Sequence, residues 1–226
     1  MPRTNSIAMR YDFENAASVF AQAFGMTIAA VKSTFKLTQS FLRLEQPFTT
    51  ANATLTFPVL NNIQAASGQY PTEQRLNQQD SFIPTKMGVY INPAASATDV
   101  ISKLLAYPNP TILTAPNAIA MQVLYNGKMV LTVNNVVYIP AWDIFKHYCA
   151  NQTQQNVATA TATDNVDQFY GDEDGKYPMQ PYVALIGSKN IQLQIQMPAA
   201  PTAIAANSRC VVWFDGILAQ NSTVVV

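Results

Sequence analysis

The chain has 226 residues, and its 13 basic and 13 acidic residues balance to a formal net charge of zero. Charged residues make up 12% of the chain, against about 25% in ordinary soluble proteins, so it carries no overall attraction toward nucleic acid or anionic membranes. The 49% share of hydrophobic residues is enough for one sizeable core. We therefore expect no strong nucleic-acid binding and a surface with little electrostatic repulsion between copies.

Residues 1–46 predict an amphipathic helical arm. Their apolar positions recur at steps of three and four, which places them on one helical face: Phe13, Ala16, Ala17, Phe20, Phe24, Ile28 and Val31. Such a face must dock on the chain's own β domain, on a neighbouring subunit or on a membrane, and we favour a subunit contact through Phe13, Phe20, Phe24 and Ile28. Asp12, Glu14 and Asn15 interrupt the apolar run, so a secretory signal is not expected.

Residues 47–226 predict a single antiparallel β-sandwich. Strand-like alternation occurs over 53–60, 81–91, 119–125, 129–133, 136–139, 191–197, 210–214 and 217–220. Pro84 requires an edge position or a bulge in its strand. Three turns are expected, at Asn126–Gly127 as a type I′ hairpin, at Asn134–Asn135 and at Asp215–Gly216.

Two short helices are expected between these strands. Residues 98–106 have a cap and an apolar stripe and end at Pro108, and residues 141–149 begin after Pro140. A long polar and acidic loop follows over 151–181, and loops of this length are commonly functional. No run of about 18 apolar residues occurs, so we expect no transmembrane segment.

The acidic part of this loop is the candidate metal site. Asp172 and Asp174 lie beside a glycine and offer the hard oxygen ligands that calcium prefers, although the twelve-residue calcium loop pattern is missing. The alternative interpretation is a solvated loop tip. No other cofactor is indicated.

Catalytic patterns are sparse. The single histidine, His147, has Asp143 four residues before it, which is the spacing of a helix-stabilising pair as well as of a catalytic one. No nucleophile elbow or phosphate-binding loop is present, so we expect no enzymatic activity and no catalytic residue. Cys149 and Cys210 are either buried thiols or one long-range disulfide.

The many short strands, the inserted helices, the helical arm and the surface rich in Asn, Gln and Thr resemble a capsid subunit of the jelly-roll type from a virus such as a bacteriophage. The resemblance implies a mainly β, jelly-roll-like sandwich at 47–226 and an arm at 1–46 that ties subunits together. The arm is only mildly basic, which favours shell building over genome packaging.

The function predicted from the sequence is therefore a structural virion protein, made in the host cytoplasm, that assembles with copies of itself and other virion proteins. The alternative is a glycan-binding or adhesive sandwich, in which Tyr170, Tyr177 and the acidic loop recognise a ligand; Tyr182 is a further tyrosine expected to be exposed. A third hypothesis is an enzyme built on Asp143 and His147.

Overall fold

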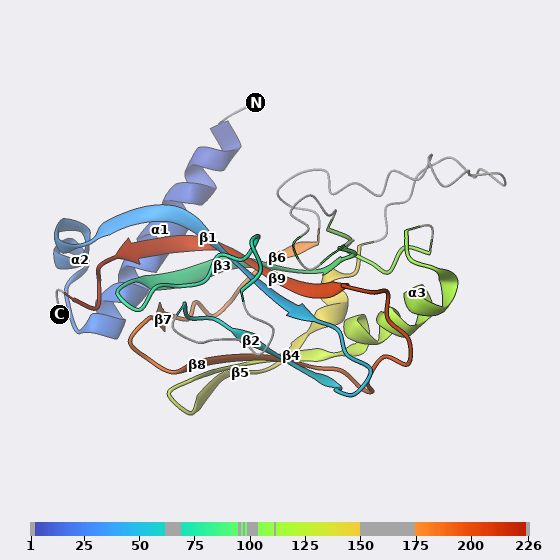
Figure 1. Ribbon diagram of the computed structural model, residues 1–226. Helices are drawn as coiled ribbons and strands as arrows, with labels where there is room; N and C mark the ends of the chain where they lie inside the picture. The colour runs from blue at the N-terminus through green and yellow to red at the C-terminus, as the bar shows by residue number, and fades with distance from the viewer. Residues whose placement is uncertain are drawn as a thin grey trace.

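The computed structural model describes residues 3–61, 69–94, 96, 98, 104–110, 112–149 and 175–224. These residues form a mainly β fold, in which two antiparallel sheets lie face to face and helices lie at the two ends (Figure 1). The predicted antiparallel sandwich class is confirmed at this level.

Sheet A has the strand order β1-β9-β3-β6, and β7 also pairs with β3. Its strands are β1 (Lys36–Pro47), β9 (Arg209–Gln220), β3 (Ser81–Asn92), β6 (Lys176–Pro178) and β7 (Leu185–Ile186). Sheet B has the order β2-β8-β4-β5, with β2 (Thr54–Pro58), β8 (Ile191–Gln196), β4 (Lys128–Val133) and β5 (Val136–Asp143). The helices are α1 (Arg3–Phe24), α2 (Ile28–Thr34), α3 (Ala115–Met121) and the 3₁₀ segments η1 (Gln122–Asn126) and η2 (Ile144–His147).

The strand pairs are nested along the chain. The first strand pairs with the last, β2 pairs with β8, β3 pairs with β6 and β7, and β4 pairs with β5 as a hairpin. Two further pairings, β3 with β9 and β4 with β8, join these pairs into the two sheets. Successive pairs therefore lie in alternate sheets, and β5 is left at the outer edge of sheet B.

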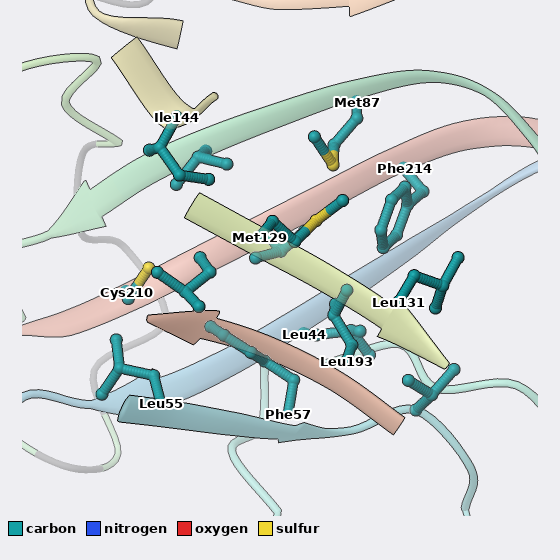
Figure 2. Close-up of a cluster of buried hydrophobic side chains, with 14 of the residues drawn as sticks. Leu44, Leu55, Phe57, Met87, Met129, Leu131, Ile144, Leu193, Cys210 and Phe214 are labelled. Carbon is teal, nitrogen blue, oxygen red and sulfur yellow. The ribbon is translucent and has the colours of Figure 1, made fainter. Parts of the chain in front are cut away.

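The core fills the space between the two sheets. Figure 2 shows side chains from both sheets pointing toward one another, among them Phe57 and Leu193 from sheet B and Met87 and Phe214 from sheet A. Strand β8 contributes to this core through every second residue: its isoleucines and leucine are buried, while its glutamines face outward or lie at the rim. This strand was predicted from its alternation, and the prediction is confirmed.

Helix α1 packs on the outer face of sheet A within the same chain. Phe20 is fully buried there, against Ile83 of β3 and Ile217 of β9. Phe13 and Phe24 pack partly buried at the edge of this cluster, and Ile28 is exposed. The predicted helical arm over residues 1–46 is therefore corrected: the helices end at Thr34, residues 36–46 lie in β1, and Phe20 is used inside the chain rather than as a subunit contact.

The prediction of a hairpin at Asn126–Gly127 is wrong. Residues 115–126 form α3 and η1, and Gly127 has an ordinary negative φ of −86°. The apolar residues Ala118, Met121 and Leu124 recur at helical spacing and are buried, so a helical turn buries more apolar surface here than a strand. The Asn134–Asn135 turn is confirmed, because both residues have positive φ angles of 49° and 64° and link β4 to β5.

The prediction of a turn at Asp215–Gly216 is also wrong, because β9 continues through both residues. Gly216 lies opposite Pro84, at the point where the register of β3 shifts, as expected for a proline inside a strand. A Cβ atom at Gly216 would collide with the backbone carbonyl of Ile83. Glycine is required here for the close approach of two strands rather than for a turn.

The prediction of a helix at 141–149 is wrong, because these residues form the end of β5 and the 3₁₀ segment η2. Ile144 and His147 are three residues apart, which is one turn of a 3₁₀ helix, and both are buried. The predicted helix at 98–106 lies mostly outside the described residues, and Leu105 at its end pairs with Ile91 of β3 instead. Of the predicted loop at 151–181, residues 175–181 are described, and they include β6.

A core substitution tests this packing. We expect Leu193→Ala, at a fully buried position between the sheets, to lower the free energy of unfolding by about 2–5 kcal/mol, because it removes buried methyl groups and leaves a cavity. Gln192→Ala, at the adjacent exposed position, should change it by less than about 0.5 kcal/mol. Urea unfolding of both variants checks this, and equal effects would contradict the assignment of β8 faces.

Candidate functional site

Strand β5 carries a cluster of exposed apolar side chains at the free edge of sheet B. Val136, Val137 and Tyr138 follow one another in the chain and are 57%, 52% and 50% exposed. Among the described residues, no strand pairs with the outer edge of β5. A continuous apolar edge strand is a common site of association between chains.

Two irregularities explain why three consecutive residues are exposed. In the pairing with β4, β5 has one extra residue between Val137 and Ile139 and another between Ile139 and Trp142. An extra residue interrupts the regular alternation of faces and turns side chains outward. Tyr138 is thereby directed away from the core although its neighbours are apolar.

A recess of about 390 Å³ lies at the other end of β5. Ala141, Met197 and Pro198 provide apolar lining, and Asn126, Lys128, Asp143 and Gln196 provide polar groups. Gly127 in the lining permits a close approach to the end of β8, because a Cβ atom there would lie 2.9 Å from the carbonyl oxygen of Gln196. The exposed cluster and the recess thus share one strand, about three residues apart.

The outer face of sheet B is polar and almost uncharged. It presents Thr54 and Thr56 from β2 and Gln192, Gln194 and Gln196 from β8. The amide of Gln194 donates a hydrogen bond of 3.3 Å to the hydroxyl of Thr56. Amides and hydroxyls can be covered by another protein at a smaller desolvation cost than charged groups.

The outer face of sheet A carries an aromatic platform beside α1. Phe41 stacks on Trp213 with ring centroids 5.0 Å apart, and Phe41 remains 41% exposed. Lys176 lies 5.3 Å from the Trp213 ring centroid and forms an ion pair with Asp215. The indole N–H donates to the same carboxylate, so most of the polar groups around this platform are bound to one another.

A buried ionic cluster lies at one end of sheet A. Glu45 on β1 is fully buried and forms ion pairs with Arg43 at 2.7 Å and with Arg209 at 3.2 Å. The hydroxyl of Thr72 also donates to this carboxylate. A buried carboxylate is stable only with such partners, because removal from water costs several kcal/mol.

Residues 69–76 supply the remaining groups of this ionic cluster. Glu73 accepts hydrogen bonds from the backbone N–H groups of Glu45 and Tyr70, both at 2.9 Å, and pairs with Arg75. Arg209 lies over the Tyr70 ring at 4.3 Å from its centroid. This segment belongs to the connection from β2 in sheet B to β3 in sheet A, so the cluster holds the crossover between the sheets.

His147 is buried and both of its ring nitrogens are occupied. The Trp142 indole N–H donates to Nε2 at 2.9 Å, so Nδ1 carries the proton and donates to the Gly175 carbonyl at 2.7 Å. Burial is the main cause that lowers the pKa of His147 from 6.5 to about 4. Asp143 caps η2 by accepting from the N–H of Phe145 and makes no bond to His147 that would orient it for catalysis.

The remaining predicted site residues are placed as follows. Asp172, Asp174 and Tyr170 lie outside the described residues. Tyr177 is exposed and packs edge-on against His147, and Tyr182 is half-buried and donates a hydrogen bond to Asp12 of α1. Cys149 and Cys210 are both free thiols, and burial raises the pKa of the Cys210 thiol.

Comparison with known proteins gave no match: no family model, no curated protein and no solved structure matches the chain. Within the described part of the chain, no helix has both the length and the apolar character needed to cross a membrane.

The buried ionic cluster makes a direct stability prediction. Glu45→Gln leaves the buried Arg209 and the half-buried Arg43 without their carboxylate, so we expect the free energy of unfolding to fall by about 3–5 kcal/mol. Glu14→Gln removes a partner of Lys32 at an exposed ion pair and should cost less than about 1 kcal/mol. Denaturant titration measures both, and similar losses would show that burial does not decide the strength of these pairs.

The low pKa of His147 predicts that the free energy of unfolding depends on pH. Because the folded pKa is depressed, the stabilising effect of neutral His147 is complete above pH 6.5 and is lost as the pH falls toward 4. At about 1.4 kcal/mol per pH unit, the loss is about 3 kcal/mol. His147→Gln should remove this slope, measured as the difference in unfolding free energy between the two proteins from pH 7 to 4. A histidine resonance that titrates near 6.5 in the folded protein would contradict the buried assignment.

Proposed function

We propose that this chain is a structural subunit of a virus particle, with a jelly-roll sandwich that associates with further copies into a shell or a capsid-associated layer. The observation that carries the proposal is the nested strand pairing. A long antiparallel ribbon of four strand pairs, rolled up so that alternate pairs lie in opposite sheets, is the arrangement of a jelly roll.

The fold alone does not determine the function, because lectins and cupins also use jelly rolls. The surface chemistry supports assembly over these alternatives. On the outer face of sheet B, β2 and β8 present threonine and glutamine, and the edge strand β5 exposes Val136, Val137 and Tyr138. Association surfaces commonly combine an apolar patch with an uncharged polar surround.

The proposed route of association differs from the one predicted from the sequence. The apolar face of α1 is covered by sheet A of the same chain, so the β domain supplies the main contact surface. Ile28 remains exposed on the helical segment and is available for a secondary contact.

A second candidate is the glycan-binding sandwich. It is supported by the half-exposed Phe41 and Trp213 platform, which offers an aromatic stacking surface beside the charged groups of Arg43, Lys176 and Asp215. The internal pairing of these groups favours a structural role for the platform, so assembly remains the leading proposal.

Light scattering of the full chain over a wide concentration range tests the proposed function. We expect the average mass to rise above 24.7 kDa with concentration, and ordered particles or layers to appear in electron micrographs. Because the proposed surfaces are largely uncharged, raising the salt from about 0.05 to 0.5 M should leave the association intact. A mass of 24.7 kDa at every concentration would contradict the proposal, and a glycan-dependent change in tryptophan fluorescence of that monomer would favour the second candidate.

A further inference from the structure

We propose that two copies of this chain pack antiparallel along β5, so that Tyr138 of each copy enters the recess of the other. The inference rests on the proposed self-association and adds its first interface, its symmetry and the residues in contact. The occupant of the recess is the aromatic side chain of a second copy.

The positions of the two features along β5 set the symmetry. Tyr138 lies three residues before Ala141, which lines the recess, and this corresponds to about 10 Å along a strand. With a two-fold axis near Ile139 and Pro140, residue 138 of one copy lies opposite residue 141 of the other. A single antiparallel contact therefore places both projecting tyrosines against both recesses.

The chemistry of the recess fits a tyrosine. Its volume of about 390 Å³ is larger than an aromatic ring needs, and Ala141, Met197 and Pro198 give the ring an apolar lining. Asp143 and Lys128 lie in the same lining, where the carboxylate of Asp143 is available to accept a hydrogen bond from a phenol hydroxyl. A side chain with an apolar ring and a polar tip meets both kinds of surface.

The charge distribution allows two copies to approach. The segment 136–142 contains no charged residue, and each recess contains one basic and one acidic side chain, so facing copies meet no net repulsion. Pro140 has no N–H, and the two irregularities bend β5, so a continuous hydrogen-bonded ladder between the copies is disfavoured. Side-chain packing at the two recesses carries the contact instead.

A second copy explains the arrangement better than an unrelated partner does. The projecting residue and the recess lie on the same strand, and a two-fold contact uses each of them twice. The contact closes on itself as a dimer, so a larger shell requires at least one other surface, such as the threonine and glutamine face of sheet B.

The test compares the dimer dissociation constants of three variants by sedimentation velocity. Tyr138→Ala removes the projecting ring, and Ala141→Trp fills the recess, so each should weaken the dimer at least about thirtyfold. Tyr11→Ala is the matched control, because Tyr11 on α1 is also a widely exposed tyrosine, at 64%. Its dissociation constant should stay within about threefold of that of the unaltered chain.

Mixing the Tyr138→Ala and Ala141→Trp chains gives the most direct test of the interface. The Tyr138→Ala chain keeps an open recess and the Ala141→Trp chain keeps its tyrosine, so one of the two contacts survives in the mixed pair. We expect the mixture to form more dimer than either variant alone. Variants that dimerise as the unaltered chain does, or a mixture no better than its components, would overturn the interface while self-association stands.

Cysteine crosslinking tests the position of the proposed two-fold axis without a measurement of affinity. On a Cys149→Ser background, Pro140→Cys lies near the proposed axis and should form a disulfide-linked dimer on mild oxidation, whereas Ile119→Cys, at an exposed position of α3, should not. Equal crosslinking at both positions would overturn the placement of the axis. An unaltered chain that remains monomeric at every concentration would overturn both this interface and the proposed function.

Discussion

The nested antiparallel pairing of strands is the constraint on which the rest of the structure depends. β1 pairs with β9 and each inner pair follows in order, so that successive pairs lie in alternate sheets and the apolar faces of the two sheets meet in one core. β4 and β5 form the innermost pair, and in the part of the chain that the structure describes no further strand pairs with the outer edge of β5. The exposed surface that we connect with function thus follows from the topology.

The crossovers between sheets are the weak points of such a fold, since each carries the chain from one sheet to the other. The connection from β2 to β3 is held by the cluster around Glu45 and Glu73, whose partners come from β1, β9 and the crossover itself. This cluster uses several of the few charged residues of the chain in its interior. The uncharged outer face formed by β2 and β8 and this buried ionic cluster both reflect the uneven distribution of the few charged residues.

The sequence predicts those features that depend on neighbouring residues. The alternation in β8, the turn at Asn134–Asn135 and the irregularity at Pro84 are local, and all three are confirmed. The predicted turn at Asp215–Gly216 is wrong because Gly216 is needed for the close approach of β9 to β3, which no local pattern reveals. The exposure of Tyr138 depends on the extra residues of β5 relative to its partner β4, and the recess depends on the proximity of residues 126–128, 141–143 and 196–198, so neither is visible in a local pattern.

Amide hydrogen exchange as a function of protein concentration tests most directly whether the chain associates through the edge of sheet B. If it does, the amides of residues 136–142 and of the recess around Gln196 should exchange more slowly as concentration rises, while those of helix α3 should not change. Exchange in β5 that is independent of concentration, in a protein that nevertheless assembles, would show that another surface joins the copies.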